Sequence, residues 1–226
     1  MQLEEDIKFL YFYDNDQRLD RQELWAEDMQ LASNEYRYLN GKLYFRTHSI
    51  YSGEKALVET SVTKYTYTGE QLTTVVENVL ERHGEESAII TNFTYTDEGF
   101  IKSAVQKWVT AEGYRIVVES TFTIGINGNI LQIKEITFTN GVAAKPDIYT
   151  MEYDDKRNPR YHLIDPVQFT EYFSPNNVVS LKEDTSAKKK TTEFRYQYNP
   201  QRMPTSVEAN DVVQTEFRNV AKWIYY

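Results

Sequence analysis

Residues 114–138 read YRIVVESTFTI-GINGN-ILQIKEITF, with alternating side-chain character on either side of a turn rich in Gly and Asn. Alternation with a period of two is typical of a half-buried β-strand, and such a turn favours a hairpin. The residues expected on one apolar face are Tyr114, Ile116, Val118, Ser120, Phe122 and Ile124, then Ile130, Gln132, Lys134, Ile136 and Phe138. Elsewhere the opposite parity mixes Glu, Lys and Thr with Val75, Trp108 and Ile133.

The same hairpin rhythm recurs along the chain. Eight of the nine glycines fall into two interleaved series, which together mark a reversal about every 14 residues. Because glycine tolerates positive φ, a regular glycine series predicts a regular series of tight turns. The two series are Gly41, Gly69, Gly99 and Gly128, and Gly53, Gly84, Gly113 and Gly141.

Pairs of aromatic residues two positions apart give the repeat a second marker. Their second members lie at positions 13, 38, 67, 95, 124, 153 and 198, where Ile124 is a degenerate member. An apolar residue follows the first five at a distance of five or six positions: Leu19, Leu43, Leu72, Ile101 and Ile130. Each unit is therefore predicted to be a strand, a tight turn, a strand and a longer turn.

These units predict an all-β fold. We expect a single repeat-built β domain over residues 1–226, an up-and-down antiparallel meander of about 14–15 strands. A twisted sheet of that width rarely stays open, so it should curl into a barrel or half-barrel. A stacked β-solenoid is the structural alternative, because fixed-period repeats also suit that architecture. Residues 76–84 and 20–33 have helix-compatible spacing, but the repeat places both on strands.

One irregularity interrupts the repeat between the markers at 153 and 198, which are 45 residues apart. This gap holds an insertion at residues 160–190. Asp165 followed by Pro166 suits a helix N-cap with proline at the first helical position. The pattern predicts one short helix near residues 166–173.

Composition excludes several classes of function. The net charge of −9 gives no basic field for nucleic acid, and the absence of Cys excludes disulfides and thiolate chemistry. No apolar run approaches the roughly 20 residues that a transmembrane helix needs. No signal peptide is visible at residues 1–10, so the protein is either cytoplasmic or lacks a leader that was removed.

No catalytic or metal-binding pattern stands out. His48, His83 and His162 are far apart and form no zinc motif. Carboxylate pairs occur at the repeat tips, where Asp caps turns, so we assign them to turns rather than to calcium binding or glycoside hydrolysis. These pairs are Asp14/Asp16, Asp97/Glu98 and Asp154/Asp155. We expect no enzyme, no cofactor and no metal.

The insertion is the best candidate for a ligand site, because it departs from the repeat and loops on rigid scaffolds often carry function. Its candidate ligand-binding residues are Tyr161, His162, Phe169, Tyr172 and Phe173. The structural alternative is that its short helix plugs the end of the barrel or covers an edge strand.

Two families resemble this sequence. The Tyr-x-Tyr-Asp units with polar tips are similar to the tyrosine–aspartate repeats of Rhs-type proteins. The C-terminal third resembles a Bacteroidetes family of exported, often lipid-anchored proteins, a domain of unknown function with a porin-like fold. The matching segments are Tyr149–Pro159, Phe173–Val179, Phe194–Tyr198 and Met203–Val207. The sequence departs from the pattern by lacking a lipobox cysteine and leader, and by having Pro204 after Arg202-Met203.

This resemblance implies an extracytoplasmic protein of the periplasm or cell surface, whose leader is absent and whose only membrane link would be a lipid anchor. Charged residues in the middle of strands argue against a lipid-facing band and favour a soluble barrel with an apolar interior. Those residues are Lys102, Lys107, Glu119, Lys134 and Glu135.

Three functions fit these observations. The first is a non-catalytic module of the cell envelope that binds a glycan, a lipid or an envelope protein. The alternative is a carrier that holds an apolar ligand inside the curled sheet. The third is a hydrolase, which requires two carboxylates, or a histidine and a carboxylate, to meet in a cleft.

Overall fold

The computed structural model describes residues 7–16, 18–52, 56–80, 86–110, 113–158, 161, 169–211 and 218–225. Within these ranges lie fifteen long strands, one two-residue strand and one short helix. Their bounds are β1 Ile7–Tyr13, β2 Leu19–Ala26, β3 Met29–Leu39, β4 Lys42–Tyr51, β5 Leu57–Thr68, β6 Gln71–Leu80, β7 Glu86–Tyr95, β8 Ile101–Thr110, β9 Gly113–Ile124, β10 Ile130–Thr139, β11 Val142–Ala143, β12 Asp147–Arg157, α1 Phe169–Phe173, β13 Asn176–Asp184, β14 Lys189–Tyr198, β15 Pro204–Asp211 and β16 Arg218–Tyr225. No helix in these ranges is long and apolar enough to cross a membrane.

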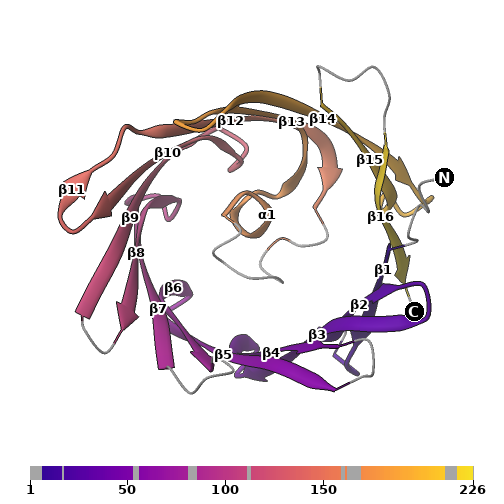
Figure 1. Ribbon diagram of the computed structural model, residues 1–226. Coiled ribbons are helices and arrows are strands. Elements are labelled where there is room, and N and C mark those ends of the chain that lie inside the picture. Colours follow the sequence, from indigo (N-terminus) through magenta and orange to yellow (C-terminus); the bar gives the residue numbers. More distant parts are fainter. Residues whose placement is uncertain are drawn as a thin grey trace.

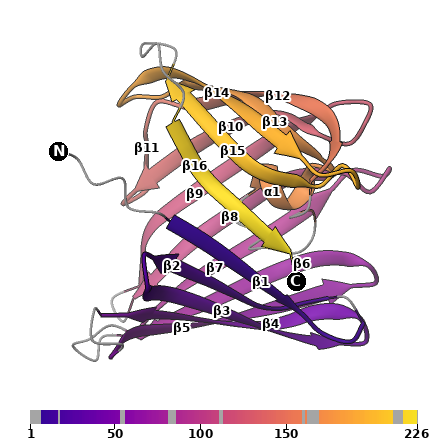
Figure 2. The same cartoon turned by 90° about the vertical axis from the view of Figure 1, so that its right-hand side faces the viewer.

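The long strands form a ring of pairings (Figure 1). Each pairs antiparallel with the next long strand along the chain, and β11 only extends the β10 hairpin. Because the number of long strands is odd, the first and last run in the same direction. β1 and β16 accordingly pair in parallel, with Phe9 opposite Trp223 and Tyr11 opposite Tyr225, and Figure 2 shows them side by side. The predicted meander is confirmed, and antiparallel pairing excludes the solenoid.

The two helix-compatible segments are strands. Residues 71–80 form β6, and residues 20–33 form most of β2, a turn and the start of β3. Residues 81–85 lie outside the described residues. The choice of strand over helix is therefore confirmed wherever the chain is described, because the two-residue period of the repeat outweighs the local helical spacing.

The short helix also lies where it was predicted. α1 spans Phe169–Phe173, inside the predicted range of 166–173, whereas Asp165 and Pro166 lie outside the described residues. The part of the insertion that leaves the ring is narrower than 160–190. It ends before β13, because β13 and the first residues of β14 take normal places among the strands.

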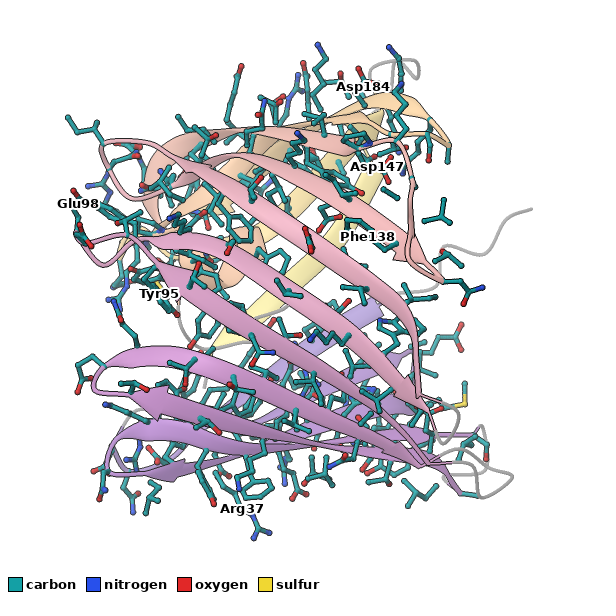
Figure 3. All side chains as sticks on the ribbon, turned by 90° about the vertical axis from the view of Figure 1, so that its left-hand side faces the viewer. Arg37, Tyr95, Glu98, Phe138, Asp147 and Asp184 are labelled. Carbon is teal, nitrogen blue, oxygen red and sulfur yellow. The ribbon has the colours of Figure 1, made fainter. Side chains whose placement is uncertain are left out.

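The two ends of the barrel differ in their connections. We call "tip end" the end formed by the hairpin turns at residues 14–18, 40–41, 69–70, 96–100, 125–129 and 199–203, and "far end" the opposite one. In Figure 3, Tyr95 and Glu98 mark the tip end, and Asp147 lies toward the far end. α1 lies inside the ring, near the tip end (Figures 1 and 2).

A β-bulge beside each tip-end turn changes which residues face inward. Register shifts fall between Phe12 and Tyr13, Arg37 and Tyr38, Thr66 and Tyr67, Thr94 and Tyr95, Ile130 and Gln132, and Gln197 and Tyr198. An extra residue on one strand switches the faces of all later residues on that strand. The marker aromatic and the apolar residue after the turn can then both face the interior.

The bulge corrects one sequence prediction. Gln132, Lys134, Ile136 and Phe138 do not share the inner face with Ile130. Ile133, which lies opposite Phe122 and is buried, and Glu135, which lies opposite Ser120, take their place. The prediction was wrong because simple alternation was carried through the turn without the extra residue. The corresponding bulges on the β5–β6 and β7–β8 hairpins likewise turn Val75 and Trp108 to the inner face.

Three marker tyrosines hydrogen-bond to the backbone of an earlier unit. The hydroxyl of Tyr38 donates to the carbonyl of Leu19 (2.9 Å), that of Tyr95 to Leu72 (2.7 Å) and that of Tyr153 to Ile130 (2.6 Å). These carbonyls belong to the buried apolar residues that follow the turns. Burial raises the pKa of Tyr95 and of Tyr153 to about 12, so both hydroxyls remain protonated donors at neutral pH.

Replacing Tyr95 with Phe should remove one such hydrogen bond while keeping the aromatic side chain. The carbonyl of Leu72 then loses its partner in a buried setting, which costs about 1–3 kcal/mol. Urea unfolding measures the change. The matched control is Tyr44→Phe, because Tyr44 is 36% exposed and should change stability by less than about 0.5 kcal/mol. Equal effects of the two substitutions would contradict a structural role for the Tyr95 hydroxyl.

Candidate functional site inside the barrel

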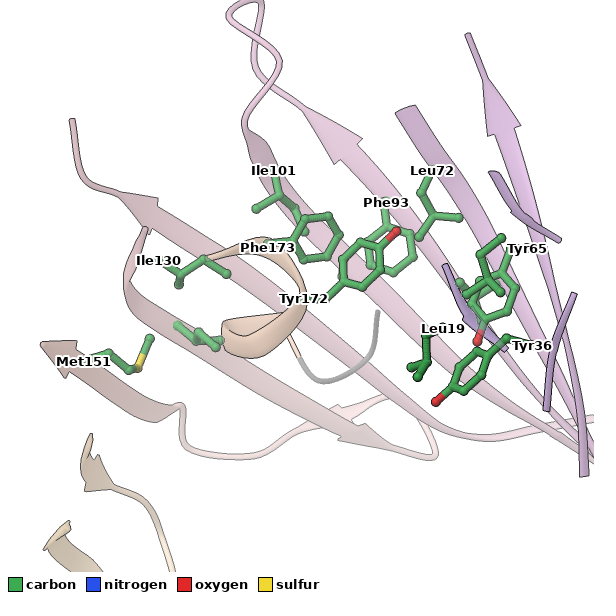
Figure 4. Close-up of a cluster of buried hydrophobic side chains, with 14 of the residues drawn as sticks. Leu19, Tyr36, Tyr65, Leu72, Phe93, Ile101, Ile130, Met151, Tyr172 and Phe173 are labelled. Carbon is green, nitrogen blue, oxygen red and sulfur yellow. The ribbon is translucent and has the colours of Figure 1, made fainter. Parts of the chain in front are cut away.

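The tip half of the interior is filled by an aromatic core around α1 (Figure 4). Phe169 packs edge-to-face against Phe122, with ring centroids 4.9 Å apart, and against Phe93 at 6.4 Å. Phe173 lies 5.7 Å from Phe93, and Tyr172 is 3% exposed. The helix thus brings side chains to the middle of the ring, where they contact residues of the wall.

Hydrogen bonds hold the segment that follows α1. The backbone N–H of Ile130 donates to Ser174 Oγ (3.1 Å), and Asn158 Nδ2 donates to the carbonyl of Ser174 (2.9 Å). Asn129 and Asn176 are joined twice, through Asn129 Nδ2 to Asn176 Oδ1 (3.0 Å) and through Asn176 N to Asn129 Oδ1 (3.1 Å). Ser174 and Asn129 have no exposed surface, so this junction belongs to the core.

These contacts locate most of the predicted ligand-binding residues. Phe169, Tyr172 and Phe173 pack inside the barrel, which is the arrangement that the plug alternative describes. Tyr161 is 36% exposed, and His162 lies outside the described residues. A ligand-binding role for these five residues stays a prediction.

Polar side chains line part of the inner wall beyond the aromatic core, contrary to the expected apolar interior. One hydrogen-bonded chain crosses β1 to β4. Gln22 Nε2 donates to the hydroxyl of Tyr11 (3.4 Å), and Gln22 Oε1 accepts from Asn34 Nδ2 (3.3 Å) and the hydroxyl of Tyr36 (3.2 Å). Asn34 Oδ1 then lies 3.0 Å from His48 Nδ1. Inward-facing amides thus occupy wall positions where a core would need apolar residues.

An ion pair continues the polar wall on β4 to β6. Arg46 Nη2 lies 3.2 Å from Glu77 Oε1 and donates to Thr63 Oγ1 (3.0 Å). Ser61 Oγ donates to the same oxygen of Glu77 (3.0 Å). Arg46 is buried, and a buried charge is tolerated only when it is paired and hydrogen-bonded, as it is here.

Carboxylates gather on β10, β12 and β13. Glu135 accepts a hydrogen bond from Ser120 Oγ (3.0 Å) and lies directly opposite Asp147 in the β10–β12 pairing. Burial and the neighbouring Asp147 raise the pKa of Glu135, although the Ser120 bond opposes the shift. Burial, with Glu135, Asp147 and Glu183 nearby, also raises the pKa of Tyr149.

Trp108 is the most accessible large residue of the described inner wall. The register places it between Ile89 on β7 and Ile116 on β9, on the same face as the buried Ala104. It is nevertheless 46% exposed. An inward-facing indole with that much accessible surface shows that solvent reaches the wall of the far half.

The tip carboxylates serve the turns. Asp14 Oδ1 accepts from the backbone N–H groups of Asp16 and Arg18, both at 2.9 Å, and the Arg18 bonds hold the pKa of Asp14 below its usual value. Asp154 Oδ1 accepts from Lys156 N (3.0 Å). The described residues contain no group of three or more His, Asp or Glu side chains that could hold a metal ion. His83 and His162 lie outside them.

Sequence reasoning missed the polar inner wall. Arg46, Glu77, Glu135 and Trp108 were not singled out as site residues, because the partners that define them lie on other strands. The five- or six-residue spacing between each marker aromatic and the next apolar residue could have indicated the bulge that turns Glu135 and Trp108 inward.

Two solved structures share this fold. A porin-like protein from Bacteroides uniformis ATCC 8492 aligns with 93% of this chain and 84% of its own, at 12% sequence identity and a TM-score of 0.50. A porin-like protein from Bacteroides vulgatus ATCC 8482 aligns with 94% of both chains, at 12% identity and a TM-score of 0.54. No family model and no curated protein matches the sequence. At this identity the likeness concerns the fold alone.

Replacing Phe173 with Ala tests whether α1 is part of the core. Phe173 is 9% exposed, and Phe-to-Ala changes in a core cost about 3–5 kcal/mol. Phe100→Ala is the control, because Phe100 lies at a hairpin tip, is 41% exposed and should cost less than about 1 kcal/mol. Urea unfolding compares them. A Phe173 variant as stable as the Phe100 variant would show that α1 does not support the fold.

Replacing Glu135 with Gln should change how stability depends on pH. The folded pKa of Glu135 is raised, so the folded state favours its protonated form. The contribution of this group is present below its unfolded pKa of about 4.3 and is lost as pH rises through the raised folded pKa. The variant should therefore lose less stability than wild type between pH 4 and pH 8.

The control for this experiment is Glu119→Gln, which removes an exposed carboxylate on the outer face of neighbouring β9. Thermal unfolding across the pH range gives the comparison. If the Glu119 variant flattens the pH profile as much as the Glu135 variant, the inner carboxylate is not the source of the dependence.

Proposed function

We propose that this protein is a non-catalytic, extracytoplasmic module of the cell envelope that binds a polar ligand inside the far half of its barrel. The observation that carries the proposal is the division of the interior. α1 and the aromatic core occupy the tip half, whereas the far half presents polar side chains and an accessible inward Trp108.

The width of the barrel supports a binding space. A barrel of about eight strands is just wide enough for its own side chains to fill, and one of about 16–18 strands leaves an aqueous channel. Fifteen strands are close to the second case. By this rule, the part of the barrel that α1 does not reach should keep a space that water or a ligand can occupy.

The chemistry of the wall favours a polar ligand over an apolar one. Gln22, Asn34 and His48 face inward on neighbouring strands, and the Arg46–Glu77 ion pair follows them. An apolar ligand would remove water from these groups without replacing its hydrogen bonds, which is costly. This weighs against the carrier of an apolar ligand.

The arrangement also gives little support to a hydrolase. Glu135 and Asp147 are neighbours on one wall, whereas glycoside hydrolysis places its two carboxylates on either side of the bond that is cut. Asp147 Oδ1 also accepts the backbone N–H of Ser186 (2.7 Å). Binding without chemistry is the simpler use of this wall.

Location in the cell envelope is supported by the family resemblance of the C-terminal third and by the porin-like fold shared with two Bacteroides proteins. Lys107, Glu119 and Lys134 lie on the outward parity of β8, β9 and β10. A lipid-facing band would have to bury these charges. The proposal is therefore a barrel in water, linked to a membrane only through a lipid anchor.

A thermal-shift screen tests this function with three panels: neutral oligosaccharides, fatty acids and short peptides. A ligand that binds the folded state raises the melting temperature by mass action. We expect that shift to be lost in Trp108→Ala and kept in Trp25→Ala, whose indole donates to Glu23 Oε2 on the outer face. Ligands that stabilise both variants equally would place binding outside the far half and contradict the proposal.

A further inference from the structure

The surroundings of Trp108 indicate what kind of ligand the far half would take. Its indole Nε1 donates to Gln106 Oε1 at 3.4 Å, near the limit for a hydrogen bond. The Nε2 group of Gln106 makes no hydrogen bond to the described residues. An accessible aromatic ring therefore lies beside an amide that still has donors to offer.

Every described inner-wall neighbour of Trp108 is uncharged. The register places Ile89 and Ile116 on either side of it, and Thr91 and Val118 on either side of Gln106. The described inward side chains of β7 and β9 carry no ionised group, so the first charges on the wall are Glu77 on β6 and Glu135 on β10, each two strands away.

A buried hydroxyl adds a second polar group to this surface. Thr91 lies directly across the ladder from Gln106, is 1% exposed, and its Oγ1 has no hydrogen-bond partner. An unpaired buried hydroxyl is costly and calls for an explanation. Gln106 lies directly across the ladder, so we infer that its amide would bond to this hydroxyl once a ligand takes the indole N–H.

We propose that Trp108 and Gln106 form a platform for one sugar ring of a neutral oligosaccharide, which rests on the proposed binding function of the far half. A pyranose ring has an apolar C–H face that matches the indole, and its hydroxyls match the donors and acceptor of an amide. A site that combines apolar surface with a few placed polar groups is the usual form of a small-molecule site.

Electrostatics makes an anionic glycan a poor ligand. Among the described side chains, the inward parity of the far half carries more carboxylates than cations: Glu59, Glu77, Glu135, Asp147 and Glu183, against Arg46 and Lys190. Arg46 is already paired with Glu77. A polyanion entering this wall would meet net repulsion, whereas a neutral chain would pay no such cost.

The test is a titration of tryptophan fluorescence with maltohexaose, cellohexaose and chitohexaose, alongside the anionic hexagalacturonate and oleate. We expect at least one neutral hexasaccharide to change the emission. Trp108→Ala should weaken that binding about tenfold, as expected for the loss of an aromatic stacking surface. Because this variant lacks the reporting indole, its binding is measured by calorimetry. Trp25→Ala should bind within about twofold of wild type.

Two further variants keep the result interpretable. Trp108→Tyr retains a flat ring and should restore most of the affinity, which separates loss of stacking from loss of folding. Gln106→Ala should weaken binding while leaving the emission change in place. The inference is overturned if none of the three neutral hexasaccharides binds, or if their binding is equal in the Trp108→Ala protein.

The outcome also separates this inference from the function on which it rests. If hexagalacturonate, oleate or a peptide binds instead, and this binding depends on Trp108, the far half remains a binding site. The neutral oligosaccharide is then rejected as its ligand. If no probe shows binding that depends on Trp108, both the oligosaccharide platform and the proposed binding function are rejected.

Discussion

The width of a fifteen-strand ring is the constraint on which the rest of this structure depends. Inward side chains from opposite walls cannot meet across such a barrel, so the walls alone cannot exclude water from its interior. The chain solves this at one end only, by placing α1 in the middle, where Phe169 and Phe173 contact Phe93 and Phe122. The aromatic core accordingly gathers around the helix, and Trp108 in the far half remains accessible to water.

The repeat explains how a sheet of this size keeps its register. A one-residue slip would exchange the inner and outer faces of a strand, and wide sheets offer many places for such slips. A bulge at each tip-end turn gives the pairing one defined position, and hydroxyls such as that of Tyr95 bind the backbone of the preceding unit. These hydrogen bonds join units whose strand register is already set by the bulges. Together they favour a single register around the barrel.

The sequence predicted the features that depend on neighbours along the chain. The turns, the meander, the short helix and the turn role of Asp14 all follow from residues a few positions apart. It did not predict the inner wall, because a bulge adds one residue without leaving a gap in the pattern. Glu135 was placed outside for that reason. The pairing of Arg46 with Glu77 spans 31 positions and two strands, so no local pattern could reveal it.

The division of the interior also separates stability from binding. Burial of apolar surface is the main stabilising term in folding, and here it is concentrated around α1 and the marker residues of the tip half. The far half contributes less of that burial, so its wall can carry amides, carboxylates and an accessible Trp108 without loss of the core. A helix that filled the whole barrel would add buried area but leave no room for a ligand. A chain with no helix would leave Phe93 and Phe122 facing water. A plug at one end meets both needs, and for that reason a search for function should begin at the end that the helix does not reach.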